Sequence, residues 1–592
     1  MIALCIISFI LQFRFFLFSD IAYLAADWFK DDAFYYLQPA WQFKQYGFFT
    51  FDGLNFTYGF QPLWIMIVTV IASITSDKIL FFQEVLIFSS LLYCIIGFQL
   101  YRLMQSATVD WYAMIPSVIW LFNYDLLYVF VSGKESILFA FLLIIILRLL
   151  FGYEKNTSVN KWIIFQLGVY SGLLILTRVN MILFLGMLIC FIIITASSVR
   201  FKKRIFDAAI ILTVASVIIL PWIIYSLVNF GTLFPNSGTA KLIGANAAIV
   251  YKVHDIMPFL KLEWLEHFIS NNERILLSSP ENLFLPSLSI ITDFFLRYVP
   301  AFSYGFGLRK ISSELSHTIK SDINIVFYVV IFILLTTAIT LMVRSKHNLF
   351  PNLSKIGTWL SQRTPLIFLF IFAIINGIVN GIFLPRYLHW SIWYAVPELL
   401  SYIIIAPFGL KYFITTLSLN EHLSDERRKK IKQIGIVAIL LISFVMLTPK
   451  KFVQRPEFQS EAWLAHEWMD VHINPKERVG AWSSGLLGYF SDGSTIINLD
   501  GLANSPKFTD EIYRKYIMLQ FGVTKENRMW EYIQQNNIRY IADADFERHL
   551  QKKPFLNTIP VNNYKIIYSG SQLIDWNEIQ GKRRFVIIHL LY

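Results

Sequence analysis

The sequence of 592 residues contains few cysteines and few charged side chains. Its three cysteines, Cys5, Cys94 and Cys190, lie in apolar segments without metal-ligand spacing, so neither a disulfide framework nor a zinc site is predicted. Charged residues make up only 15% of the chain, whereas a soluble globular protein is nearer to about a quarter. Apolar residues reach 56%. This balance predicts an integral membrane protein.

Long apolar stretches supply the expected membrane crossings. Several approach the roughly 20 apolar residues needed to span a bilayer, namely 139–150 with its flanks, 181–196, 205–230, 323–343, 365–384 and 434–447. The net charge of +11 gathers in part at residues 200–204 and 427–432, each beside such a stretch. Basic clusters in this position mark the cytoplasmic side, so no nucleic-acid partner is predicted.

Alternation from these clusters predicts the topology. It places the loops at about 25–78 and 231–321, and everything after about residue 450, outside the cytoplasm. The apolar segment 62–75 is short and is interpreted as interfacial or re-entrant, which leaves about 11 crossings, within a range of 9 to 13. The first segment carries Arg14 and lacks a basic flank; a start site further upstream would explain that, and a signal peptide is not favoured.

The chain changes character near residue 450. Charge rises, and short β-like runs alternate with helical stretches at 460–471 and 509–519; the runs are 478–482, 494–499, 538–542, 564–568 and 585–590. We therefore expect a helical membrane domain over 1–450 and a soluble α/β domain over 451–592. No P-loop, Rossmann glycine pattern, HExxH or GxSxG stands in a supporting context.

Two adjacent carboxylates, Asp31 and Asp32, are the first candidate for chemistry. Like charges side by side raise the pKa of at least one of them, and such a carboxylate can act as a general base. The alternative is an acidic turn that caps the helix 33–46, and spacing alone favours that alternative.

The predicted topology brings further polar residues to the same membrane face. Glu135 and Lys134 lie at one helix junction, Arg178 in a tight turn, and Lys241 and Arg386 at two more junctions. Helix-end electrostatics alone can explain the pair of Lys134 and Glu135, but a cation in the turn of Arg178 is costly unless it meets an anion. A guanidinium binds phosphate with two parallel hydrogen bonds, so an anionic ligand is a natural partner.

Six motifs in order resemble the GT-C superfamily of membrane glycosyltransferases, in particular a bacterial branch similar to protein O-mannosyltransferases and lipid A aminoarabinose transferases. The motifs are Asp-Asp-Ala-Phe-Tyr-Tyr at 31–36, Gly-Phe-Gln-Pro-Leu-Trp at 59–64, Ser-Gly-Lys-Glu at 132–135, Leu-Thr-Arg-Val-Asn at 176–180, Phe-Gly-Thr-Leu-Phe-Pro-Asn-Ser-Gly-Thr-Ala-Lys at 230–241, and Val-Gly-Ala-Trp at 479–482 followed by Asn-Leu-Asp-Gly-Leu-Ala-Asn at 498–504. They touch most of the chain.

The resemblance implies inverting transfer of a sugar from a polyprenyl-phosphate donor to a glycan, lipid or protein acceptor at the outer face of the bacterial cytoplasmic membrane. Asp31 or Asp32 would be the general base, and Glu135 a second acid near the donor phosphate. The donor phosphate would be bound by four cations, Lys134, Arg178, Lys241 and Arg386. The substrate would be lined by Tyr35, Tyr36, Gln61, Asn180, Asn236 and His389.

Two positions depart from the family pattern, since Gln61 stands where histidine is common and Asn180 where aspartate is common. A lone histidine such as His389 is more often structural than catalytic. A cofactor is not required by the pattern, although a divalent cation (Mg²⁺ or Mn²⁺) held by Asp32 and Glu135 is compatible with it.

Two other functions compete with this hypothesis. A transporter or flippase for lipid-linked sugars would show internal repeats and charges near the bilayer midplane, whereas here the charges gather at one face. A non-catalytic membrane scaffold is the third alternative.

Overall fold

The computed structural model describes most of the chain outside two long stretches. The described residues are 1–107, 111–155, 161–195, 201–243 without 234 and 242, 364–383, 392–404, 458–544 without 492 and 521–523, 564–570, 574–575, 582–583 and 585–591. The apolar stretches predicted at 323–343 and 434–447, the basic cluster 427–432 and most of the loop 231–321 lie outside them.

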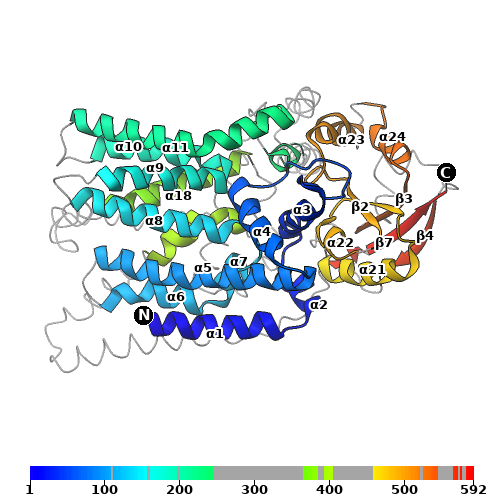
Figure 1. The fold of residues 1–592 in the computed structure, drawn as a ribbon, viewed down its shortest axis with the longest axis horizontal. Helices are drawn as coiled ribbons and strands as arrows, with labels where there is room; N and C mark the ends of the chain where they lie inside the picture. The colour runs from blue at the N-terminus through cyan, green and yellow to red at the C-terminus, as the bar shows by residue number, and fades with distance from the viewer. Residues whose placement is uncertain are drawn as a thin grey trace, which may run out of the picture.

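The bundle at the left of Figure 1 is built from helices of the first 383 residues. They include α1 (Ile2–Phe18), α5 (Lys78–Ala107), α6 (Ile115–Phe122), α7 (Tyr124–Phe130), α8 (Ser136–Lys155), α9 (Lys161–Thr177), α10 (Ile182–Thr195), α11 (Phe201–Phe230) and α18 (Thr364–Phe383), and the short α2 (Ile21–Tyr23) follows α1. In the described part of the chain, three helices are long and apolar enough to cross a membrane, or five if two bent pairs each count as one span. The expected total of about 11 crossings stays a prediction.

Small residues let two of the long helices approach closely. A Cβ atom added at Gly168 or Gly172 of α9 would lie within 3 Å of side chains of α11, Val214 and Ile218 respectively. Helices in a bilayer gain little from the hydrophobic effect and associate through such close packing of small residues. The glycines therefore fix how α9 packs on α11.

Two helices lie between the bundle and the C-terminal part, as Figure 1 shows. Helix α3 (Asp31–Tyr46) has both acidic residues in its first turn, where the helix dipole stabilises a negative charge. It ends at Gly47, whose φ of 73° is a conformation that glycine adopts readily. Helix α4 (Pro62–Ile74) has a proline at its start and is 13 residues long. The chain enters this region through a bend of 110° between Ile2–Phe18 and Ile21–Trp28.

The C-terminal part is a mixed sheet covered by helices. Its five strands follow the order β2-β1-β3-β7-β4, in which β1 is parallel to both β2 and β3 while β7 is antiparallel to β3 and β4. These strands are β1 (Arg478–Ala481), β2 (Thr495–Asn498), β3 (Ile538–Ala544), β4 (Tyr564–Ser569) and β7 (Phe585–Leu590), and each lies at one of the five predicted runs. Strands β5 (Ile574–Asp575) and β6 (Lys582–Arg583) form a separate pair.

The helices of this part join it to the bundle. They are α21 (Phe458–His472), α22 (Gly485–Phe490), the π-helix Phe508–Tyr513, α23 (Arg514–Gln520) and α24 (Arg528–Gln535). Phe34 of α3 packs against Tyr489 and Phe490 of α22, with ring centroids 5.3 and 5.6 Å apart. One cluster of buried apolar side chains runs from the bundle through α3 into α21 and α22. The C-terminal part is thus held against α3 by a shared core.

Candidate active site

The first turn of α3 directs its two carboxylates to different partners. Asp31 accepts hydrogen bonds from the backbone N–H groups of Gly485 (3.3 Å) and Leu486 (2.8 Å) at the start of α22. Burial raises the pKa of Asp31 to about 6; the amide of Leu486 opposes that shift and the charge of Asp32 adds to it. Asp31 is therefore a carboxylate with raised proton affinity, held in place by neutral donors.

Asp32 is held by ammonium groups instead. Its Oδ2 atom lies 3.1 Å from Nζ of Lys134 and 3.4 Å from Nζ of Lys241. Burial acts to raise the pKa of Asp32, but the two lysines outweigh it and hold that pKa well below its usual range. Burial lowers the pKa of Lys134 to about 8, even though Asp32 opposes the shift. Asp32 remains ionised and is a weak proton acceptor.

A second ion pair lies beside the first. Both Nε and Nη2 of Arg178 donate to Oε1 of Glu135, at 3.0 and 2.8 Å, and the hydroxyl of Tyr36 donates to Oε2 at 3.0 Å. Only 6% of Glu135 and 3% of Arg178 is exposed. Burial acts to raise the pKa of Glu135, but Arg178 and Lys134 together hold it below the usual value. This fully bonded carboxylate positions Arg178.

Two aromatic rings make cation–π contacts with these cations. The short 3-10 helix Ile392–Ala395 supplies Trp393, whose ring centroid is 3.2 Å from Nζ of Lys134, and Tyr394, whose ring is 5.0 Å from the guanidinium carbon of Arg178. Lys241 also donates to the Tyr394 hydroxyl at 2.9 Å. Sequence reasoning placed these aromatics beside a membrane segment but did not assign them to the site. Cation–π contacts of this kind help to fix three cations in one place.

The other predicted lining residues take several positions. The side-chain carbonyl of Gln61 accepts from the backbone N–H of Val179 at 3.3 Å, and Asn180 is exposed. Asn236 is buried and donates to the backbone carbonyls of Gly501 (2.6 Å) and Asn504 (3.1 Å), so its amide joins two loops. Arg386 and His389 lie outside the described residues.

The C-terminal part contributes groups that sequence reasoning did not assign. The Tyr35 hydroxyl accepts from the backbone N–H of Ser484 (3.1 Å) and donates to Oδ2 of Asp500 (3.2 Å). Burial raises the pKa of Asp500 to about 7, and the charge of Asp31 adds to that shift. Asp500 lies within the motif at 498–504, and that motif was the only signal pointing to it.

The donor set does not fit a divalent cation. Within the described parts of the chain, no three His, Cys, Asp or Glu side chains come together as metal ligands. Asp32 and Glu135, the expected ligands, are already paired with Lys134, Lys241 and Arg178. A metal ion would have to displace these cations, because two carboxylates cannot neutralise three cations and a divalent ion as well.

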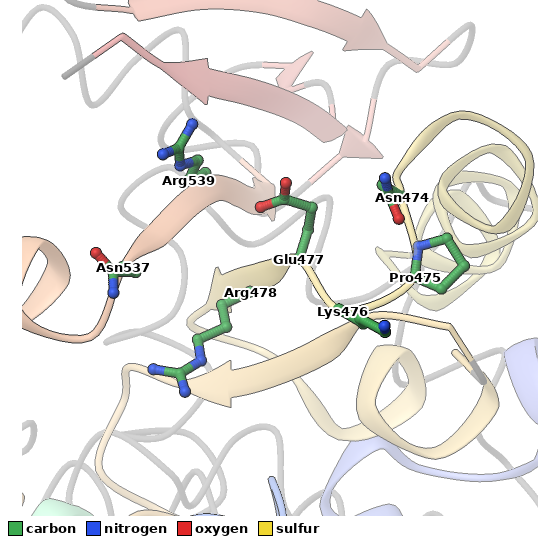
Figure 2. A pocket seen from close by; sticks show the side chains of 7 residues that line it. All are labelled: Asn474, Pro475, Lys476, Glu477, Arg478, Asn537 and Arg539. Carbon is green, nitrogen blue, oxygen red and sulfur yellow. The ribbon is translucent and has the colours of Figure 1, made fainter.

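An open hollow on the C-terminal sheet is a separate feature. Figure 2 shows it at the amino ends of β1 and β3, lined by Asn474, Pro475, Lys476, Glu477, Arg478, Asn537 and Arg539. The groups around Asp31 come from the opposite, carboxyl ends of β1 and β2. The hollow therefore forms no part of the candidate site.

Comparisons with known proteins give distant similarities. A family model described as a domain of unknown function (DUF8728) matches residues 452–586, and a search of the curated proteins found no match. ArnT from Cupriavidus metallidurans bound to undecaprenyl phosphate is 11% identical with a TM-score of 0.44, over 98% of this chain and 97% of that one. The oligosaccharyltransferase AglB from Archaeoglobus fulgidus, in complex with an inhibitory peptide and a dolichol-phosphate, is 12% identical with a TM-score of 0.46, over 92% and 69%.

Proposed function

We propose that this chain is a GT-C glycosyltransferase that moves a sugar from a polyprenyl-phosphate donor to an envelope glycan, lipid or protein. The observation that carries the proposal is the pairing of one proton-accepting carboxylate, Asp31, with an adjacent cluster of three cations. Such an arrangement matches the two needs of the reaction, a base for the acceptor and positive charge for the leaving group.

Asp31 is the better candidate for the base. Its two amide hydrogen bonds leave lone pairs on a carboxylate that can accept up to about four. Its raised pKa gives it more proton affinity than Asp32, whose charge is neutralised by lysines. Asp31 takes the proton of the acceptor hydroxyl, and the acceptor oxygen attacks the anomeric carbon from the face opposite the phosphate.

The cation cluster then stabilises the leaving group. As the bond between the anomeric carbon and the phosphate oxygen breaks, the electron pair stays on that oxygen and the polyprenyl phosphate gains charge. Lys134, Lys241 and Arg178 bring three cations together beside Asp32 and Glu135, and this cluster would meet the charge of the phosphate. Attack opposite the departing phosphate inverts the anomeric configuration. We place this chemistry at the outer face of the bacterial cytoplasmic membrane.

A deletion strain tests the proposal for any sugar, because the donor that accumulates identifies the sugar. Mass spectrometry of its envelope glycans and lipid extracts should reveal the loss of one sugar from one glycan and the accumulation of its polyprenyl-phosphate form. Wild-type protein should restore the sugar, and the Asp31→Asn variant should not. Unchanged glycans, or full restoration by a folded Asp31→Asn variant, would contradict the proposal.

A further inference from the structure

Two loops of the C-terminal sheet end beside Asp31. Strands β1 and β2 are parallel neighbours, with Ala481 paired to Asn498 at their carboxyl ends. Because parallel strands deliver their following loops to one edge of a sheet, functional groups collect there. The loop after β1 supplies Ser484, Gly485 and Leu486, and the loop after β2 supplies Asp500.

Hydrogen bonds tie the two loops to each other. Nδ2 of Asn498 donates to the Ser484 hydroxyl at 2.9 Å, while its Oδ1 accepts from the N–H of Ala503 at 3.1 Å. Asp500 in turn accepts from the N–H of Leu502 at 2.8 Å through Oδ1, which leaves Oδ2 for Tyr35. The position of the Asp500 carboxylate is therefore set by the fold of the loop.

Tyr35 lies between this loop and the proposed base. It follows Asp31 by one helical turn on α3, and its hydroxyl accepts from Ser484 and donates to Asp500. Burial, Asp500 and Asp31 all raise the pKa of Tyr35 well above its usual range, so the hydroxyl keeps its proton. The hydroxyl therefore donates its one proton to Asp500, accepts from Ser484 and does not act as a base.

We propose that Asp500 is a positioning residue for Asp31 that acts through the Tyr35 hydroxyl, so that the segment matched by the domain of unknown function completes the active site. This inference rests on the proposed function. Among the described residues, the titratable side chains that interact with Asp31 include Asp32, Tyr35 and Asp500. Asp32 is paired with Lys134 and Lys241, whereas Asp500 accepts from the Tyr35 hydroxyl. That hydroxyl accepts in turn from the N–H of Ser484, the residue just before the two amides that bind Asp31. By fixing the Tyr35 hydroxyl, Asp500 holds the 484–486 segment where its amides bind the base.

A double-mutant cycle tests the inference. Purified Asp31→Asn, Asp500→Asn, Tyr35→Phe and the Tyr35→Phe/Asp500→Asn double variant are each added to membranes of the deletion strain, which hold donor and unmodified acceptor. Sugar transfer is followed by mass spectrometry. Binding of undecaprenyl phosphate to each variant is measured separately and reports on the folded cation cluster. The matched control is Asp510→Asn, an exposed aspartate of the same C-terminal part that pairs only with Arg514 in the described contacts.

We expect Asp500→Asn and Tyr35→Phe each to lower the transfer rate about 10- to 100-fold, the loss that follows from removing one hydrogen bond in a charged network. The double variant should be no slower than the slower single variant, because both changes break the same link. Undecaprenyl phosphate should bind all of these variants as it binds the wild type, and Asp510→Asn should transfer at the wild-type rate.

Three results would overturn the inference. Asp500→Asn transferring as fast as Asp510→Asn would show that the carboxylate is not needed. Losses that multiply in the double variant would show that Asp500 does not act through Tyr35. Loss of undecaprenyl phosphate binding in Asp500→Asn would assign the residue a purely structural role. Full transfer by Asp31→Asn would instead refute the proposed function itself, whatever Asp500→Asn does.

Discussion

Asp31 and Asp32 are adjacent in the chain, yet they belong to two chemically different halves of the site. The amide half consists of Asp31, Tyr35, Asp500 and the N–H groups of 484–486; the cationic half consists of Asp32, Glu135, Lys134, Arg178 and Lys241. Burial raises the pKa of Asp31 and the neutral amide donors only partly offset it, while ammonium groups hold the pKa of Asp32 below its usual range. The type of partner, rather than the type of residue, thus distinguishes the pKa of one carboxylate from that of its neighbour.

Removal of the Asp31 carboxylate from the amide half should have the largest effect on sugar transfer. Asp31→Asn keeps the size of the side chain but cannot accept the acceptor's proton, so we expect transfer to fall about 100- to 10,000-fold. Undecaprenyl phosphate should still bind, because the cationic half is untouched. Loss of lipid-phosphate binding together with transfer would show that the two halves are not separable.

Breaking the buried ion pair should mainly affect stability. Glu135→Ala leaves Arg178 buried without its carboxylate, which costs about 3 to 5 kcal/mol when one partner of a buried pair is removed. Unfolding of the purified protein in detergent measures the change. Glu526→Ala removes an exposed partner of Lys515 and Arg528 and should leave stability nearly unchanged, because solvent screens exposed ion pairs. Equal losses of stability in Glu135→Ala and Glu526→Ala would contradict the prediction that the buried pair contributes more than the exposed one.

The two lysines of the cationic half should set the affinity for the lipid phosphate. Lys134→Met and Lys241→Met should each weaken undecaprenyl phosphate binding about tenfold, because each removes a charged donor. Added salt should weaken binding to the wild type further. Lys515→Met, at an exposed lysine of the C-terminal part, is the control. Unchanged affinity in both variants would remove these lysines from the phosphate site.

A methyl group added at Gly485 should disturb the amide half and leave the cationic half unchanged. A Cβ atom at Gly485 would lie 2.3 Å from the carbonyl oxygen and 2.7 Å from Oδ1 of Asp31, so Gly485→Ala must displace the carboxylate or α22. We expect transfer to fall about tenfold, in the range that overpacking costs, with lipid-phosphate binding retained. Gly186→Ala on α10 meets nothing within 4 Å and serves as the control.

The pH dependence of transfer should link the two halves. Below about pH 6 Asp31 holds a proton and cannot act as a base, so the rate should rise as pH increases through that value. Asp32 contributes to the raised pKa of Asp31 by repulsion. Asp32→Asn should therefore move the rise to lower pH, which rates from about pH 4 to about pH 8 will show. A shift to higher pH would contradict this coupling.

The sequence predicted the five strands of the C-terminal sheet and that several charged residues of the site share one face. The strands could be predicted because short runs rich in β-branched residues alternate with turns. Charge alternation across the membrane placed Asp31, Asp32, Lys134, Glu135, Arg178 and Lys241 on one face, and the structure brings these side chains together, although their roles stay predictions.

The rest depended on contacts that local pattern does not encode. The partners of Asp31 are backbone amides of Gly485 and Leu486, and any residue type supplies an amide. Asn236 was expected to line the substrate, but its amide is bonded to carbonyls of a distant loop. Asp500 could not be assigned to the site by itself, because its hydrogen bond with Tyr35 forms only when two segments that are remote in the sequence pack together.

The hydrogen bond between Asp31 and the N–H of Leu486 spans 455 positions of the chain. At synthesis rates of about 5 to 20 residues per second, Asp31 leaves the ribosome about 20 to 90 s before its amide partner does. During that interval the proposed base exists without the groups that hold it. A chain that ends before residue 484 therefore lacks the amides that hold Asp31.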